Sequence, residues 1–302
     1  MPKPPVAARI CYSFDAGFAD CTLVSAYSTL KNGNVSELRF YTLGEMGDFG
    51  ARVAKLRAAF PDCKILLEAL PEELFNFTPP APLTAATFAR LLLLRILRGK
   101  WLYLDGDTLV LSSLSPLFEQ PLGGKAFGGV LDYSLRRATA RGKWRRLRRK
   151  LLRRRAVWHH ESDARRGELM DMDRYINTGV LLFDTEIFRT HANFDFLTSL
   201  EASSAFVDKH QLQYADQDWI NYEMTDQIAY IHPRWNLIWG ADPKARRFMT
   251  KSELEAVAEA NAAPSIIHYA GVKPWHDCVE RNPRYAAQAA IWQNYAAELA
   301  AL

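Results

Sequence analysis

The chain has 302 residues, of which 49% are hydrophobic and 24% are charged, and its formal net charge is +4. This composition is ordinary for a globular protein and excludes fibrous and low-complexity classes. The first ten residues contain no apolar segment, and the most apolar stretch (88–97) carries Arg90 and Arg95, so we expect neither a secretory signal nor a membrane-spanning helix. Four cysteines without CxxC spacing indicate reduced thiols in a cytoplasmic protein.

The first hundred residues alternate short β-rich runs with segments of helical periodicity. Strands are expected at 8–14, 38–43, 65–67 and from 101, with helices at 20–31, 49–60 and 83–97. Further on, strands are expected at 125–131, 179–183 and 265–269, and helices from 215 and from 283 to the end. Alternating βα units predict an α/β fold in which a mainly parallel sheet is flanked by helices. With no repeat and no flexible linker, residues 1–302 are expected to form one domain, with a basic insertion at about 134–172.

The run WLYLDGD at residues 101–107 ends an apolar strand with two carboxylates. On extended backbone, side chains two residues apart point to the same face, so Asp105 and Asp107 can bind one cation together. Two carboxylates suit Mg²⁺ or Mn²⁺, which can in turn hold a phosphate, although a simple turn after a strand has the same composition. Asp15 also follows a strand. Because ligands of open parallel sheets bind beyond the carboxyl ends of the strands, these carboxylates are expected to line one crevice.

A second polar cluster follows the expected strand at 265–269. His268 ends this strand, Gly271 permits close backbone approach, and Lys273 carries a charge that can meet a phosphate. A lone histidine is more often a hydrogen-bonded structural residue, and a lone lysine is usually solvated. Together with the carboxylate pair, however, the cluster predicts a site for a metal and a diphosphate.

Six motifs in this order resemble glycosyltransferase family 8, the retaining enzymes of the GT-A fold that include bacterial lipopolysaccharide galactosyl- and glucosyltransferases and glycogenin. The motifs are SFDAGF (13–18), ATFARL (86–91), YLDGD (103–107), YINTG (175–179), DQD (216–218) and HxxGxxKPW (268–275). The resemblance runs from about residue 10 to residue 275. It implies a GT-A fold and the transfer of a hexose, galactose or glucose, from a UDP-sugar to a glycan or glycolipid acceptor such as lipopolysaccharide.

The resemblance also implies how the donor is bound. In the family, the residues corresponding to Asp105, Asp107 and His268 hold Mn²⁺, which bridges the diphosphate of the UDP-sugar. Mixed carboxylate and imidazole ligands suit Mn²⁺ better than Mg²⁺, which remains the alternative. By the same resemblance, Lys273 and the backbone of Gly271 contact the phosphates.

Three further positions correspond to donor-binding residues of the family. Asp15 corresponds to the residue that hydrogen-bonds uracil, and Phe18 to a position where the family often stacks a tyrosine on the base. Phenylalanine keeps the stacking face and loses the hydroxyl. Arg90 corresponds to an arginine that reaches the donor, although an arginine in an apolar helix can also extend its head group out of the core.

Asp132, Asn177, Asp216 and Gln217 correspond to residues that line the donor sugar and the acceptor pocket, although Asp216 would also suit a helix start. Gln217 corresponds to the family residue nearest the reactive carbon. An amide is a poor nucleophile, so front-face attack is favoured over double displacement through a protein nucleophile. In this scheme Gln217 and Asp216 position the sugar, while the metal stabilises the departing diphosphate.

Residues 136–155 contain 12 Lys and Arg and no Asp or Glu, whereas the rest of the chain carries 26 basic and 34 acidic residues. Apolar residues at 144, 147, 151 and 158 fall on one stripe of the expected helix. A basic amphipathic helix at 141–158 predicts peripheral binding to an anionic membrane, at the cytoplasmic face of the inner membrane. An acidic glycan or lipopolysaccharide phosphate is the second choice, and nucleic acid is a less expected partner.

Three other functions fit parts of the sequence. The chain could be an inert protein that tethers to membrane or nucleic acid through the basic segment, but the intact Asp/Asp/His/Lys set argues against it. A nucleotide-sugar hydrolase would use the same metal site. Self-glucosylation on a tyrosine, as in glycogenin, is a variant that the sequence does not distinguish.

Overall fold

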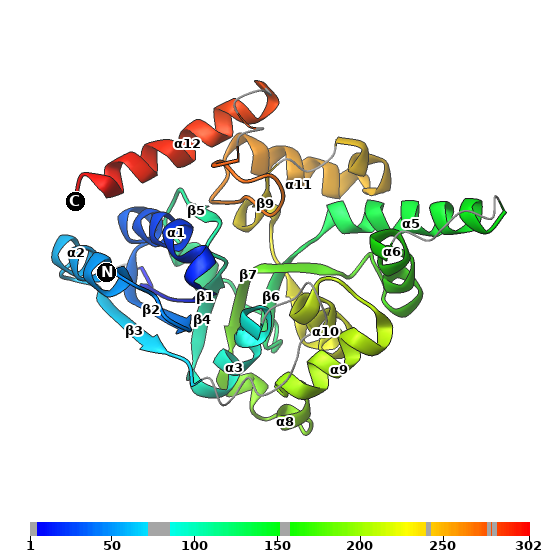
Figure 1. Cartoon of the computed structure of the whole chain (residues 1–302), viewed down its shortest axis with the longest axis horizontal. Helices are drawn as coiled ribbons and strands as arrows, with labels where there is room; N and C mark the ends of the chain where they lie inside the picture. Colours follow the sequence, from blue (N-terminus) through cyan, green and yellow to red (C-terminus); the bar gives the residue numbers. More distant parts are fainter. Residues whose placement is uncertain (1–4, 72–84, 152–157, 240–242, 277–278, 280–282) are drawn as a thin grey trace.

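The computed structural model describes residues 5–71, 85–151, 158–239, 243–276, 279 and 283–302. A seven-stranded sheet in the order β3-β2-β1-β4-β7-β6-β8 forms its centre, and helices flank it (Figure 1). The strands are β1 (Ala8–Asp15), β2 (Val35–Leu43), β3 (Lys64–Ala69), β4 (Lys100–Leu104), β6 (Phe127–Leu131), β7 (Ile176–Asp184) and β8 (Ile228–Tyr230). The expected α/β fold is confirmed.

Six of these seven strands run in one direction, and β7 runs in the other. β1 pairs in parallel with β2 and β4, β2 with β3, and β6 with β8, whereas β7 is antiparallel to both β4 and β6. Because β7 is antiparallel to β4, the first residues of β7 lie beside the residues that follow β4. The Asp105 N–H accordingly donates to the Gly179 carbonyl at 2.7 Å. The sheet topology therefore joins two motifs that lie more than seventy residues apart.

A second, three-stranded sheet brings in the C-terminal motif. It consists of β5 (Thr108–Val110), β10 (Ile266–His268) and β9 (Leu237–Ile238), with β10 antiparallel to β5 and parallel to β9. The register sets His268 opposite Thr108, and the Tyr269 N–H donates to the Asp107 carbonyl at 2.9 Å. The strand expected near 265–269 is present. β5 and β9, and β8 of the large sheet, were not expected, because strands this short show too little periodicity to be distinguished reliably in a sequence.

The helices agree with the expected pattern in the first hundred residues, with one interruption. The segment expected as a single helix at 83–97 is a 3₁₀ turn (Ala85–Phe88) followed by α3 (Ala89–Ile96), and residues 83 and 84 lie outside the described part. The other helices are α1 (Ala19–Asn32), α2 (Phe49–Ala59), α4 (Ser115–Glu119), α5 (Tyr133–Leu151), α6 (Trp158–Leu169), α7 (Thr185–Phe188), α8 (Phe194–Leu197), α9 (Leu200–His210), α10 (Ala215–Glu223), α11 (Lys251–Ala262) and α12 (Pro283–Ala300).

The basic segment contributes α5 and α6, which pack against each other on the side of the molecule opposite α1 and α2 (Figure 1). Three apolar side chains of α5 are exposed: Trp144 (76%), Leu147 (54%) and Leu151 (75%). Residues 152–157 and the side chain of Trp158, the last member of the expected stripe, lie outside the described part. In the part of the chain that is described, no helix combines the length and apolar character needed to cross a bilayer.

The described cysteines carry free thiols: Cys11 and Cys21 are buried and Cys63 is half-buried. Burial raises the pKa of each of these thiols, to about 11 for Cys63. They are therefore protonated and inert near neutral pH. Cys278 lies outside the described residues.

Candidate active site

A cleft of about 600 Å³ opens at the edge of the sheet where β1, β4 and β6 end. This volume is within the usual range for a small-molecule site. Of the residues predicted from the sequence, the following line the cleft: Asp15, Phe18, Arg90, Asp105, Asp107, Asp132, Asn177, Gln217, His268, Gly271 and Lys273. Asp216 is buried behind the wall of the cleft, where it pairs with Arg90.

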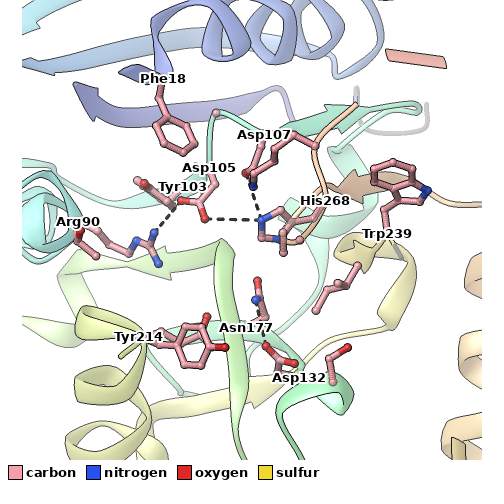
Figure 2. Close-up of a pocket in the computed structure, with 18 of the residues that line it drawn as sticks. Phe18, Arg90, Tyr103, Asp105, Asp107, Asp132, Asn177, Tyr214, Trp239 and His268 are labelled. Atoms are coloured by element: carbon pink, nitrogen blue, oxygen red, sulfur yellow. Dashed lines mark hydrogen bonds and ion pairs between the residues drawn. The ribbon is translucent and has the colours of Figure 1, made fainter. Parts of the chain in front are cut away.

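Asp105, Asp107 and His268 offer three ligand atoms that all lie within 4.8 Å of one another. His268 Nε2 is 3.3 Å from Asp107 Oδ1 and 3.8 Å from Asp105 Oδ2 (Figure 2). Asp107 Oδ1 is buried and has no hydrogen-bond partner. A buried carboxylate oxygen without a donor is costly unless a cation or a proton meets it. The donor set therefore fits a divalent metal.

The imidazole of His268 is oriented by a hydrogen-bond chain behind it. His268 Nδ1 lies 3.0 Å from Asn236 Oδ1, and Asn236 Nδ2 donates to Asn177 Oδ1 at 2.9 Å. Because the Asn236 oxygen faces the ring, we assign a proton to Nδ1, so that Nε2 is the nitrogen directed at the two carboxylates and at a metal that they would hold. This is the arrangement that usually fixes a metal-binding histidine.

Gly179 leaves the space in which these three side chains meet. A Cβ at this position would overlap His268 Cε1 and stand 2.6 Å from Asp105 Oδ2. No side chain larger than hydrogen fits there without displacing the ligand cluster. Glycine in the YINTG motif is thus required by close approach rather than by backbone conformation.

Cations balance the two carboxylates of the cluster. The Lys273 ammonium donates to Asp107 Oδ2 and, at 2.7 Å, to the Tyr269 carbonyl. Burial raises the pKa of Asp107, but the charges of His268 and Lys273 outweigh burial, so that the pKa is lowered and the group is ionised. Asp105 is paired with Arg90, whose Nη2 donates to Asp105 Oδ1 at 2.8 Å.

Arg90 is shared between two carboxylates. It is 8% exposed, lies 3.0 Å from Asp216 Oδ2 as well as contacting Asp105, and its guanidinium stacks over the Tyr103 ring at 4.2 Å. One guanidinium cannot neutralise both carboxylates. Burial raises the pKa of Asp216 to about 7; Arg90 lowers it and the nearby Asp105 raises it further.

Gln217, Asn177 and Asp132 form the polar wall opposite the cluster. Gln217 Oε1 accepts from the Thr178 N–H at 3.1 Å, and its Nε2 donates to the Tyr175 hydroxyl at 3.3 Å. Asn177 Nδ2 donates to Asp132 Oδ2 at 3.2 Å. Burial raises the pKa of Asp132. These contacts fix the orientation of two amides and a carboxyl group that line the cleft.

Two further residues line the cleft: Asp15, which ends β1, and Phe18, which lies in the 3₁₀ turn that follows. The Phe18 ring is 43% exposed and points into the cleft (Figure 2). Asp15 caps the 3₁₀ turn of residues 16–18 by accepting from the Gly17 N–H at 3.0 Å. An exposed aromatic face beside a carboxylate can stack and hydrogen-bond a nucleobase.

Among the residues of the site that sequence reasoning missed are Tyr103, Tyr214 and Trp239, which line the cleft, and Asn236, which holds His268. Tyr103 could have been found, because it precedes Asp105 by two residues and so faces the same side of the strand. Tyr214 precedes the DQD motif. Asn236 and Trp239 lie in an irregular stretch that carries no pattern, and only the fold brings them to the site.

Comparison with known proteins agrees with this geometry. The model of the family described as "Glycosyl transferase family 8" matches residues 9–278. The chain belongs to this family. The lipopolysaccharide 1,2-glucosyltransferase of Escherichia coli is 23% identical over 276 residues, which cover 89% of this chain and 72% of that protein. General stress protein A of Bacillus subtilis is 24% identical over 182 residues, or 59% of this chain and 53% of that protein.

Solved structures of this family's fold resemble the chain over nearly its whole length. The galactosyltransferase LgtC, in complex with donor and acceptor sugar analogues, superposes with a TM-score of 0.66 at 26% identity, covering 96% of this chain and 95% of LgtC. The bifunctional glycosyltransferase WbbM gives a TM-score of 0.68 at 20% identity, covering 91% of this chain. The chain spans only about half the length of WbbM and of the B. subtilis protein. The family and the GT-A fold expected from the six motifs are confirmed.

The raised pKa of Asp216 predicts a pH effect on stability. Its carboxyl titrates near 4 in the unfolded chain and at about 7 in the folded protein. Between these values the folded protein keeps a proton that the unfolded chain has lost. The free energy of unfolding therefore falls as pH rises, by up to about 1.4 kcal/mol per pH unit.

Asp216→Asn removes this titration, so wild type should lose thermal stability relative to the variant between pH 5 and 7. The two melting temperatures are to be compared across pH 4–8 without metal or nucleotide. A difference that stays constant with pH would contradict the raised pKa.

Proposed function

We propose that this protein is a retaining glycosyltransferase that moves a hexose, galactose or glucose, from a UDP-sugar to a glycan or glycolipid acceptor. The observation that carries the proposal is the cluster of Asp105, Asp107 and His268 beside the Lys273 ammonium. It lies in one cleft between an exposed aromatic ring at one end and a polar wall at the other. A metal-and-diphosphate site in that position suits a nucleotide-sugar donor.

Asp105, Asp107 and His268 would hold Mn²⁺, with Mg²⁺ as the alternative, because their mixed oxygen and nitrogen ligands suit Mn²⁺ better. When bound, the metal supplies positive charge to the diphosphate that leaves the sugar. Lys273 adds a fixed cation beside the same group, and the exposed backbone of Gly271 lies two residues before it. Phe18 and Asp15 would bind the uracil, since both line the cleft from the short turn that follows β1.

The polar wall suits front-face attack on the sugar. Gln217 is an amide held at both its oxygen and its nitrogen, and Asp216 is buried and paired with Arg90, so neither is placed as a free nucleophile. Asp132 and Asn177 would orient sugar hydroxyls, and Gln217 would stabilise the positive charge that grows on the sugar ring. The proton of the attacking hydroxyl goes to the departing phosphate oxygen, so no separate base is required.

The acceptor would reach the site from an anionic surface. α5 begins at the cleft, where Ser134, Leu135 and Arg137 form part of the lining, and continues to the exposed Trp144 and Leu147. Exposed apolar side chains on a strongly basic helix favour an anionic membrane over solvent. We therefore propose peripheral binding of α5 at the cytoplasmic face of the inner membrane, where a lipopolysaccharide-type glycolipid would be the acceptor. An acidic glycan is the alternative partner, and nucleic acid is less suited because exposed apolar side chains add nothing to phosphate binding.

Asp107→Asn tests the proposed reaction, because it keeps the shape of the side chain and removes its charge. We expect hexose transfer to fall at least a hundredfold, or about 2.7 kcal/mol of transition-state stabilisation, since charge on the leaving diphosphate is no longer offset. Transfer is measured by the mass of the product formed from UDP-galactose or UDP-glucose with a glycan acceptor and Mn²⁺. Release of free hexose without a transfer product, with acceptor present, would instead indicate a hydrolase.

Asp20→Asn is the matched control, because Asp20 is an exposed carboxylate of α1 that pairs with Arg52 and is not among the residues that line the cleft. It should behave as wild type. Full turnover by Asp107→Asn in the presence of EDTA would rule out the metal assignment.

The membrane contact is tested by replacing Trp144, Leu147 and Leu151 together with serine. Each exposed apolar side chain contributes on the order of 1 kcal/mol when buried in an interface, so vesicles of anionic lipid should be bound about a hundredfold less tightly. Ile96→Ser, which removes an exposed apolar side chain of α3, is the control. Equal sedimentation of wild type and the triple variant with anionic vesicles would exclude a membrane role for this face of α5.

A further inference from the structure

Arg166 of α6 is a fully buried cation that no sequence motif predicted. Its guanidinium is engaged on every nitrogen. Nε donates to Asp218 Oδ1 at 2.6 Å, Nη1 to Asp163 Oδ1 at 2.8 Å, and Nη2 to Asp218 Oδ2 at 3.3 Å and Ser162 Oγ at 3.4 Å. The planar fork thus grips the Asp218 carboxylate with two parallel bonds, an arrangement that only arginine provides.

Asp218 in turn forms hydrogen bonds with residues at the wall of the cleft. Its Oδ1 accepts from the Tyr175 hydroxyl at 2.7 Å, and the same hydroxyl accepts from Gln217 Nε2 at 3.3 Å. Its Oδ2 accepts from the Tyr214 N–H at 3.0 Å. Arg166 also lies against the Tyr214 ring, 4.5 Å from its centroid. Two residues that line the cleft, Gln217 and Tyr214, are therefore held through one buried ion pair.

The turn that carries these residues is strained. Ala215, between Tyr214 and Asp216, has a φ of +38°, a backbone conformation that alanine rarely adopts. Such conformations persist only where surrounding contacts enforce them, and they gather at functional sites. Here the bond from the Tyr214 N–H to Asp218 spans the strained residue, and Arg166 fixes the carboxylate that accepts it.

We propose that Arg166 is a positioning residue: through Asp218 and Tyr175 it sets the orientation of Gln217, and through Asp218 and its own stacking it holds Tyr214. The inference rests on the proposed transferase function only for its effect on catalysis. In this proposal α6 supports the site, although it lies within the segment that the sequence predicted to be an insertion. The Arg166–Asp218 ion pair also connects the helix pair α5–α6 to the cleft.

The contacts of Arg166 support only one side of the site. Arg166 contacts the elements that hold the sugar-facing wall, whereas Asp105, Asp107, His268 and Lys273 are held by Arg90, Asn236 and one another. Disturbing Arg166 should therefore change how the sugar is presented and leave metal-dependent UDP binding intact. A general loss of folding would weaken both hexose transfer and UDP binding.

Arg166→Lys tests the proposal, because it keeps the buried charge and removes the fork and the stacking plane. We expect kcat for hexose transfer to fall at least tenfold, with the Kd for UDP in Mn²⁺ changed less than twofold. Hydrogen–deuterium exchange should rise at residues 214–221 and stay at the wild-type level in β1 and β4. Tyr175→Phe removes the hydroxyl that links Asp218 to Gln217 by hydrogen bonds, and it should lower kcat similarly. The double variant should have a kcat little lower than that of either single variant, because both substitutions break the same series of hydrogen bonds.

Arg165→Lys is the matched control, since Arg165 is the neighbouring arginine of α6 and its Nη2 donates to the Gln211 carbonyl instead. It should match wild type in kcat and in exchange. Wild-type kcat in Arg166→Lys, or unchanged exchange at 214–221, would overturn the proposal. A parallel loss of UDP binding and of protection in β1 and β4 would also overturn it, by showing a purely structural role. If wild type itself transfers no hexose, the proposed function fails, and exchange at 214–221 still decides whether Arg166 holds this turn.

Discussion

Two carboxylates of like charge meet in the wall of the cleft, one of them buried, and the surrounding structure is organised by the need to hold them there. Asp107 is 4% exposed, and Asp105 stands next to it across one glycine of the same turn. Arg90 and Lys273 each pair with one of them, and His268 lies between them. Without such partners, repulsion between the two carboxylates would destabilise the fold. A divalent cation among the three ligands would meet the buried Asp107 Oδ1, which has no hydrogen-bond donor.

The sheet topology explains how partners so distant in sequence reach these carboxylates. Reversal of β7 between β4 and β6 sets the YINTG motif beside Asp105, and Gly179 admits the imidazole of His268. The small sheet of β5, β9 and β10 carries His268 to the other side of Asp107. Because both arrangements depend on strand pairing, a change in register at β10 would turn the histidine to the opposite face.

The sequence predicted the parts of the site that follow regular strands. Asp105 and Asp107 were found because a two-residue spacing on a strand has one structural meaning, and Asp15 because it ends the first strand. The six ordered motifs predicted the family and the residues of the polar wall. The family is confirmed and the wall residues lie in or beside the cleft, whereas their catalytic roles stay predictions.

The sequence did not predict contacts that depend on tertiary packing. Asn236 orients His268 from an irregular stretch, and Arg166 reaches Asp218 from a helix that reads as part of a basic insertion. Neither has a spacing or a neighbour that distinguishes it from a surface residue. Arg166 is also one of many arginines in that region, so its complete burial could be known only from the fold.

The central claim is that Asp105, Asp107 and His268 together hold a divalent metal against the diphosphate of UDP. Its most direct test is anomalous diffraction at the manganese edge from crystals grown with MnCl₂ and UDP. The account predicts one strong peak about 2.1–2.4 Å from a carboxylate oxygen of each aspartate and from His268 Nε2. This distance lies between the ligand distances of Mg²⁺ and Ca²⁺. The UDP phosphates should complete its coordination. A peak elsewhere, or ordered UDP in the cleft without a metal at these three side chains, would contradict the claim.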